Sequence, residues 1–249
     1  MDPQTNFILP PFVINETPEP HARQRIVAAY DANLASADRE LGKIFDYLKQ
    51  VGLWENSVII VLADHGEAFW EHGKQGHNYP LYEEILRIPF LIRIPAESEL
   101  AGKRISYPVA SFDIFPTLVD LLQFSRRGAY WSGISLLPSL YQNGMMPERL
   151  LVSQTARRRI YSCRWRNLKY IWHDKDGIKE NELYNLNTDP QEKLNLIKKF
   201  PILAAYLHHE IVKYLRQSHV IEKPEQTSKR PAIDPEVQEE LRALGYVDQ

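Results

Sequence analysis

The 249-residue sequence has little cysteine, no long apolar run and almost no excess of charge of either sign. Its one cysteine, Cys163, excludes an internal disulfide framework and a cysteine-rich zinc site. No apolar run approaches the roughly 18 residues of a membrane-spanning helix. The N-terminal residues also lack the basic flank and apolar stretch of a signal peptide, and the compartment stays unknown. Without a long apolar run we expect no membrane span, and because the net charge of −2 gives no general attraction to polyanions, we expect no nucleic-acid partner.

What the sequence does contain is an ordinary globular composition, with 44 % apolar and 25 % charged residues. At about 150 residues per domain, the length predicts one or two domains. In residues 1–145, a helical pattern at 21–50 is followed by apolar runs at 57–63 and 89–95 and by a helical pattern at 113–122. This alternation predicts an α/β core. The continuous β-branched run at 57–63 further predicts a strand buried on both faces, as in a parallel sheet.

The pattern changes after residue 145. Short strand-like segments alternate with tight turns in residues 146–190, which predicts a small antiparallel sheet. Residues 191–249 contain an amphipathic helix at 201–217, a polar linker and a short helix at 236–244. The expected architecture is therefore a mostly parallel α/β core with flanking helices, then a small antiparallel sheet, then C-terminal helices.

Chemistry-bearing residues follow the first apolar run directly, in the segment Asp64-His65-Gly66-Glu67. In open α/β sheets ligands bind beyond the carboxyl ends of strands, and a carboxylate beside an imidazole can hold a divalent cation. Ca²⁺, Mn²⁺ and Zn²⁺ are the candidate ions. Remaining ligands that are rich in oxygen favour Ca²⁺, and a decreasing share of oxygen favours Mn²⁺ and then Zn²⁺. The structural alternative is that Asp64 caps a helix and His65 is an ordinary polar side chain. Three histidines within 13 residues argue against a mere connector, but the pattern alone leaves both interpretations open.

A basic stretch with interleaved aromatic residues lies at 157–170. Such a stretch is compatible with nucleic-acid binding. We favour a structural interpretation, an antiparallel hairpin whose charged side chains point outward, and place binding of an anionic substrate next.

Seven segments occur in an order and spacing that resemble a known family: 30–48, 58–67, 71–90, 111–118, 133–136, 182–192 and 241–247. The sequence resembles the C-terminal portion of the sulfatase family, within the alkaline phosphatase-like superfamily. The resemblance implies that residues 1–145 form part of an alkaline phosphatase-like α/β sandwich and carry its metal-site motif. Residues 146–190 would then be the antiparallel subdomain, and residues 191–249 the C-terminal helices and linker.

By this resemblance, Asp64 and His65 are ligands of the active-site metal, with Ca²⁺ expected and Mn²⁺ as the alternative. His77 lies where the family has a group that contacts the sulfate and assists the leaving oxygen. His72 and Lys74 are further substrate-binding candidates, for which ordinary surface polarity is the competing explanation.

The family's nucleophile has no counterpart in the sequence. That nucleophile stands in a C-x-P-x-R context and is oxidised to formylglycine, whereas Cys163 has no such context and is interpreted as a packing residue. At Gln4, a segment similar to a mid-chain family motif has an amide where the family has a substrate-contacting histidine. We therefore expect a truncated, C-terminal part, with formylglycine only on a missing N-terminal part.

Two classes of function follow from these observations. The first is a metal-dependent sulfuric ester hydrolase, present as a C-terminal part that is inactive alone and is completed by a separate N-terminal half or by self-association. A phosphoric ester or phosphonate hydrolase of the superfamily is a close variant, so the substrate would be a sulfate or phosphate ester. The second class is a catalytically inactive remnant or binding module of the same fold.

Overall fold

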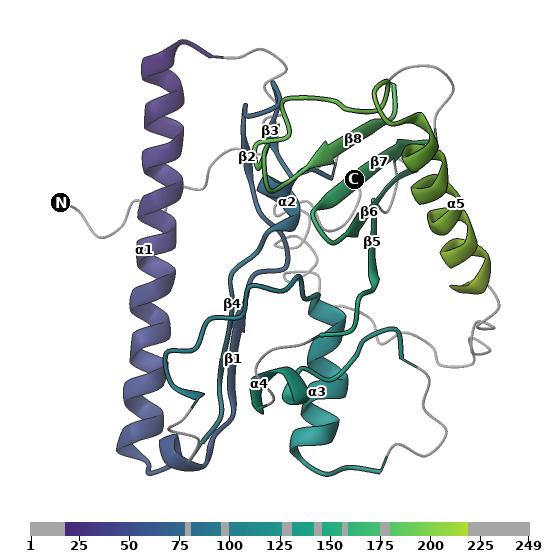
Figure 1. Ribbon diagram of the computed structural model, residues 1–249. Coiled ribbons are helices and arrows are strands. Elements are labelled where there is room, and N and C mark those ends of the chain that lie inside the picture. The colour runs from purple at the N-terminus through teal and green to yellow at the C-terminus, as the bar shows by residue number, and fades with distance from the viewer. Residues whose placement is uncertain are drawn as a thin grey trace, which may run out of the picture.

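The computed structural model describes residues 18–77, 81–95, 100–125, 131–141, 146–155, 159–174 and 180–218. Within these ranges, the helix α1 runs along one side, the four-stranded sheet β5–β8 and the helix α5 lie on the other, and the short helix α2 lies between them (Figure 1). The interpretations that concern Gln4, Arg157, Arg158 and the terminal linker and helix fall outside the described residues. Among the helices that the structure describes, none combines the length and the apolar character that crossing a bilayer requires.

The predicted N-terminal helix is present as α1, Pro20–Gln50, which begins with proline in its first turn, where the missing N–H costs nothing. It ends as predicted before Gly52, whose φ of +73° suits glycine. No residue of α1 is buried in the structure. Its aromatic contacts are few: Tyr30 meets Phe69 at 5.0 Å and Phe45 meets Trp54 in the 3₁₀ turn η1, Trp54–Asn56, at 5.5 Å.

The two apolar runs form β1, Ile59–Leu62, and β4, Phe90–Arg93. They pair antiparallel, with Ile59 opposite Arg93, and not parallel as predicted for the first run. Burial on both faces is also wrong for this pair, because Leu62 is 38 % and Leu91 61 % exposed. An apolar run indicates that a strand can be covered on both faces, but it contains no information on strand direction or on what covers it.

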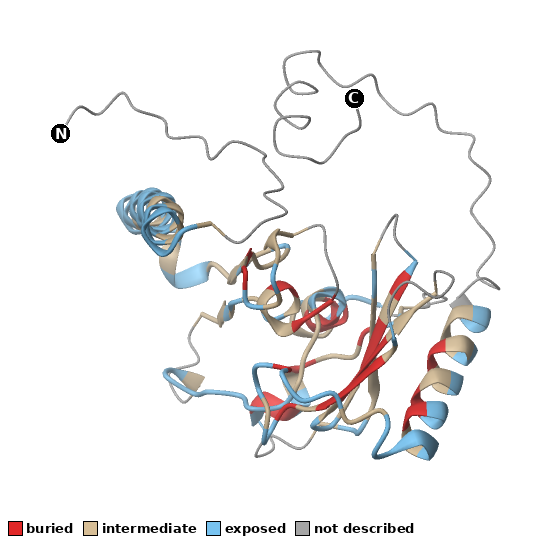
Figure 2. Cartoon of the chain, turned by 90° about the horizontal axis from the view of Figure 1, so that it is seen from above, coloured by how far each residue is buried: buried red, intermediate tan, exposed pale blue. Residues whose placement is uncertain are grey.

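The predicted small antiparallel sheet is confirmed. Its strands are β5 Leu150–Gln154, β6 Ile160–Trp165, β7 Leu168–His173 and β8 Glu182–Asn185, in the order β5-β6-β7-β8. One face packs on α5, Pro201–Ser218, through Cys163, Tyr170, Leu183, Ala204, Leu207 and Ile211. Figure 2 shows buried residues in this sheet, on the turns of α5 that face it and in the short helices beside it, whereas α1 has none. Cys163 is fully buried as a packing residue, and burial raises the pKa of its thiol to about 12.

The opposite face of this sheet holds α2, Glu83–Leu86, and the two residues before it. Leu81 and Tyr82 pack against Ile160, Ile171 and Tyr184 of the sheet. The Tyr82 hydroxyl also donates to the Glu182 carboxylate at 2.6 Å, which His173 contacts at 2.8 Å. Apolar burial and satisfied buried polar groups together fix α2 to the sheet.

The remaining elements are η3 Ser111–Asp113, α3 Ile114–Leu121 and α4 Leu137–Tyr141. The fully buried Asp113 accepts the backbone N–H groups of Ala110 at 2.8 Å and Ile134 at 3.0 Å, and it pairs with Arg149. Asp113 therefore ties three segments together and has a structural role.

Candidate functional site

The segment Asp64–Glu67 connects β1 to a small hairpin made of β2, Ala68–Phe69, and β3, Gln75–Gly76. Ala68 pairs with Gly76, so that Glu67 and His77 are the next residues on either side of the hairpin's open end. The hairpin therefore returns His77 to the turn that carries Asp64 and His65. His65 and His77 are 12 positions apart in the sequence, and this strand register brings them together.

Gly66 allows this turn to lie against α2. Its N–H donates to the carbonyl of Ile85 at 2.8 Å. A Cβ at this position would lie 2.0 Å from the Glu84 carbonyl oxygen, closer than any side-chain carbon can approach. The glycine thus fixes the position of the metal-site motif on the helix that is itself anchored to the C-terminal sheet.

His65 has its two ring nitrogens in different environments. Nδ1 lies 2.8 Å from the Gly66 carbonyl oxygen, which can only accept, so Nδ1 carries the proton in the neutral ring. Nε2 then presents its lone pair, and it lies 3.7 Å from Oδ2 of Asp64. The other Asp64 oxygen, Oδ1, accepts the backbone N–H of His65 at 3.0 Å. A carboxylate oxygen and an unprotonated imidazole nitrogen therefore face each other at an accessible position.

Glu67 and His77 join His65 in a cluster of possible metal ligands, which among the described residues does not include Asp64. His77 Nδ1 lies 2.9 Å from Glu67 Oε2, and the His77 ring stacks on His65 with centroids 4.1 Å apart. The hydrogen bond to Glu67 raises the pKa of His77 above its ordinary value, against the opposing effect of burial. One ligand atom from each of His65, Glu67 and His77 lies within 4.8 Å of the others, a separation that a single metal ion can bridge.

Glu67 lies in the segment 64–67 that was named from the sequence, but it was assigned no role at the site. The sequence did contain a sign that Glu67 lies beside His77, because the two residues are equally distant from the glycine-containing turn at 70–74. Recognising it required the hairpin register, which strands of two residues do not reveal.

His72 and Lys74 lie elsewhere, on the closed end of the hairpin. His72 Nδ1 lies 2.6 Å from Glu84 Oε1, Nε2 lies 3.1 Å from the Glu192 carbonyl oxygen, and the ring stacks on Tyr82 at 3.6 Å. The Lys74 carbonyl accepts the N–H of Trp70 within the turn. Neither residue is among the described residues that line the cavity next to Asp64, so the structure does not bring them to the other candidates.

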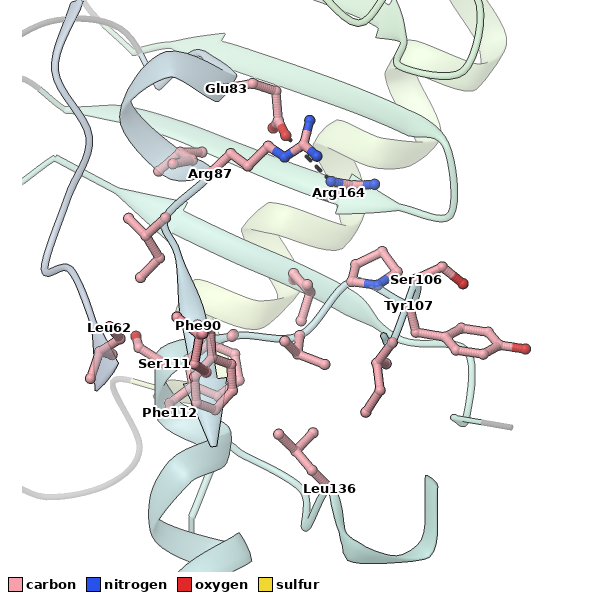
Figure 3. A pocket seen from close by; sticks show the side chains of 18 of the residues that line it. Leu62, Glu83, Arg87, Phe90, Ser106, Tyr107, Ser111, Phe112, Leu136 and Arg164 are labelled. Carbon is pink, nitrogen blue, oxygen red and sulfur yellow. Dashed lines mark hydrogen bonds and ion pairs between the residues drawn. The ribbon is translucent and has the colours of Figure 1, made fainter. Parts of the chain in front are cut away.

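That cavity has a volume of about 2080 Å³ and extends from Asp64, His65 and His77 to the C-terminal sheet. Its walls include α2, β4, the segment 100–112 and parts of β5, β6 and β7 (Figure 3). Sites for small ligands commonly measure about 300–1,000 Å³, so there is room for more than one charged group of a substrate.

Comparison with known proteins identifies the family and the fold. A sulfatase family model matches residues 7–124. Arylsulfatase K of Homo sapiens is 30 % identical over 209 residues, covering 78 % of this chain and 38 % of that protein. Arylsulfatase K of Bos taurus is 29 % identical over 221 residues, covering 84 % and 40 %. The chain thus spans about 40 % of the length of these curated relatives.

Solved structures show the same fold. A putative sulfatase from Bacteroides thetaiotaomicron matches with a TM-score of 0.66 and 23 % identity, over 89 % of this chain and 48 % of that one. The phosphonate monoester hydrolase of Agrobacterium radiobacter matches with a TM-score of 0.64 and 24 % identity, over 84 % and 46 %. The expected α/β alkaline phosphatase-like fold with a small antiparallel sheet is confirmed, and the chain belongs to the sulfatase family.

Proposed function

We propose that this chain supplies the metal-binding and leaving-group side of the active site of a sulfuric ester hydrolase. In this proposal Asp64 and His65 are metal ligands, and His77 assists the leaving oxygen. The observation that carries the proposal is the turn at Gly66, which directs the unprotonated His65 nitrogen toward the Asp64 carboxylate at the edge of the cavity.

The donor set fits a divalent cation. Asp64 offers a charged oxygen, His65 offers a neutral nitrogen, and the Nδ1–H of His65 is held by a backbone carbonyl, as is common for metal-binding histidines. Two ligands fill only part of a coordination shell, and an oxygen-rich remainder would favour Ca²⁺, with Mn²⁺ as the alternative. Such an ion supplies positive charge that stabilises the negative charge developing on a transferring sulfuryl group.

His77 is suited to hold a proton toward the substrate. Glu67 accepts from Nδ1, which fixes the ring and stabilises its protonated form. The opposite nitrogen, Nε2, then carries a proton that can be donated to a leaving alkoxide. Glu67 acts here as a positioning residue, because it reaches the reaction only through His77.

A binding module of the same fold is the second candidate function. The sequence contains no C-x-P-x-R segment, and the pKa of Cys163, raised to about 12 by burial, keeps this thiol protonated. The same metal ligands and cavity would then hold a ligand without turning it over.

Calorimetric titration with Ca²⁺ tests the metal site. We expect Asp64→Ala to abolish Ca²⁺ binding, since a single histidine cannot replace the charge of the carboxylate. Asp46→Ala removes an exposed carboxylate of α1 that pairs with Lys49 at 3.2 Å, and it should leave binding unchanged. Unaltered Ca²⁺ affinity in Asp64→Ala would refute the assignment.

A further inference from the structure

The cavity that Asp64 and His65 line has more cationic than acidic residues in its walls. Six cationic and three acidic residues line the cavity: Arg87, Arg93, Lys103, Arg104, Arg164 and Lys169, against Glu55, Asp64 and Glu83. Arg93 is occupied by Glu55 at 3.3 Å and by two backbone carbonyls. Lys169 is only 1 % exposed and lies 2.9 Å from both Glu83 and Glu192. These pairs leave an excess of cations that face the open space.

Arg87 and Arg164 are two cations that line the cavity next to the anchored helix α2. Arg87 follows the last residue of α2, and its N–H donates to the Glu83 carbonyl at 2.8 Å. Arg164 extends from β6 and reaches Glu83 with one guanidinium nitrogen at 3.4 Å, a long contact. Figure 3 shows both side chains extending toward the same part of the cavity beside Glu83.

Glu83 cannot satisfy both arginines. Its carboxylate already receives the buried ammonium of Lys169, which it shares with Glu192. Among the residues that the structure describes, none forms an ion pair with Arg87. Counting these five side chains as ionised gives three positive and two negative charges, so an oxyanion from a ligand would balance the group.

The arrangement is connected directly to the candidate metal site. The backbone N–H of Gly66, next to His65, donates to the carbonyl of Ile85 in α2. Arg87 directly follows the last residue of this helix. Both sites open into one cavity, so a single molecule can contact both.

We infer that Arg87 and Arg164 form a second anion-binding subsite, which selects esters that carry an additional carboxylate or sulfate group. The inference rests on the proposed function for the placement of the ester itself. The subsite supplies planar guanidinium donors that match a carboxylate or sulfate oxygen pair. It gives a role to Arg164, a basic residue of the 157–170 stretch that lines the cavity.

Binding by the whole chain in the presence of Ca²⁺ tests the subsite. The probes are three disaccharides of one backbone: one with a single sulfate ester, one with that ester and a carboxylate, and one with two sulfates. We expect the two doubly charged probes to bind about tenfold tighter than the singly charged one. Arg87→Ala and Arg164→Ala should each remove most of this difference and leave the singly charged probe unaffected. Arg87 is exposed, so its variant tests the subsite even if Arg164→Ala is unstable.

Arg166→Ala is the matched control, since Arg166 pairs with Glu148 on the surface and is not among the described residues that line the cavity. Equal affinity of the wild-type chain for all three probes would overturn the subsite, and so would an equal loss in Arg166→Ala, which would indicate a general charge effect. A preference for only one of the doubly charged probes identifies the second anion. Asp64→Ala separates the two proposals: if it binds every probe as the wild type does while Arg87→Ala does not, the metal site fails and the subsite stands.

Discussion

Because Gly66 has no side chain, the turn at the candidate site can lie directly against α2. We expect Gly66→Ala to lower the free energy of unfolding by about 1–3 kcal/mol, because the new methyl group would overlap the Glu84 carbonyl. Urea denaturation measures the change. Gly42→Ala is the matched control: it lies within α1 with no atom within 4 Å of the added Cβ, so the same substitution should stabilise by about 0.4–1 kcal/mol. Equal behaviour of the two variants would contradict the close approach of the turn to α2.

Glu67 can serve the site in two ways, and one substitution separates them. If Glu67 only positions His77, Glu67→Gln should retain the affinity for Ca²⁺, because Asp64 and His65 are untouched. If Glu67 is itself a ligand, as its distance from His65 and His77 permits, the affinity should fall by at least about tenfold. Calorimetry on this variant, beside wild type and Asp64→Ala, distinguishes the two roles.

At the scale of elements, the β2–β3 hairpin is held on α2 by the pair His72–Glu84. Burial lowers the pKa of His72, but the hydrogen bonds to Glu84 and to the Glu192 carbonyl outweigh it, and the pKa is raised above 6.5. Burial likewise opposes ionisation of Glu84, yet its bond to His72 lowers its pKa below 4.5. His72 and Glu84 are therefore both ionised in the folded state at pH values between 4.5 and 6.5.

We expect the stability supplied by His72 to depend on pH. A group whose folded-state pKa is raised contributes fully below its unfolded pKa, and this contribution is lost as the pH rises through the folded value. His72→Gln should therefore cost roughly 1–2 kcal/mol at about pH 5.5 and clearly less at about pH 8.5. Denaturation of both chains at the two pH values checks this, and a cost that grows with pH would contradict the ion pair.

Helices and strands with a strong periodic pattern of apolar residues were predictable from the sequence. Which other elements pack against them was not. The helix at 21–50 and the four short strands after residue 145 appear where the pattern placed them. Leu62 and Leu91 gave the signal of buried strands but lie exposed, because residue type does not determine what packs against it. At the site, Asp64, His65 and His77 were selected from the sequence, but Glu67 and Arg87 depend on register and on tertiary contact.

At the scale of the whole molecule, the described surface includes large apolar side chains that are more than half exposed: Leu34, Ile44, Tyr47, Leu53, Leu91, Phe115, Phe124, Leu194 and Ile202. Exposed apolar area of this kind marks contact surfaces. A separate N-terminal half, or a second copy of the chain, remains the predicted partner.

We expect the chain by itself to show no hydrolysis of 4-nitrophenyl sulfate, with or without Ca²⁺. In the proposed function, the segment Asp64–His65 stabilises charge but supplies no attacking group, and the sequence contains no nucleophile segment of the family type. Absorbance of the released 4-nitrophenolate measures turnover. Saturable, Ca²⁺-dependent release of this product would show that a nucleophile is present after all.

Cys163 lies beneath α5, fully enclosed, and is the sequence's lone thiol. A disulfide reagent such as Ellman's cannot reach it while the helix rests on the sheet. The chain therefore contains a built-in reporter, whose colour development tracks the lifting of α5 from β6 and β7 without any introduced label.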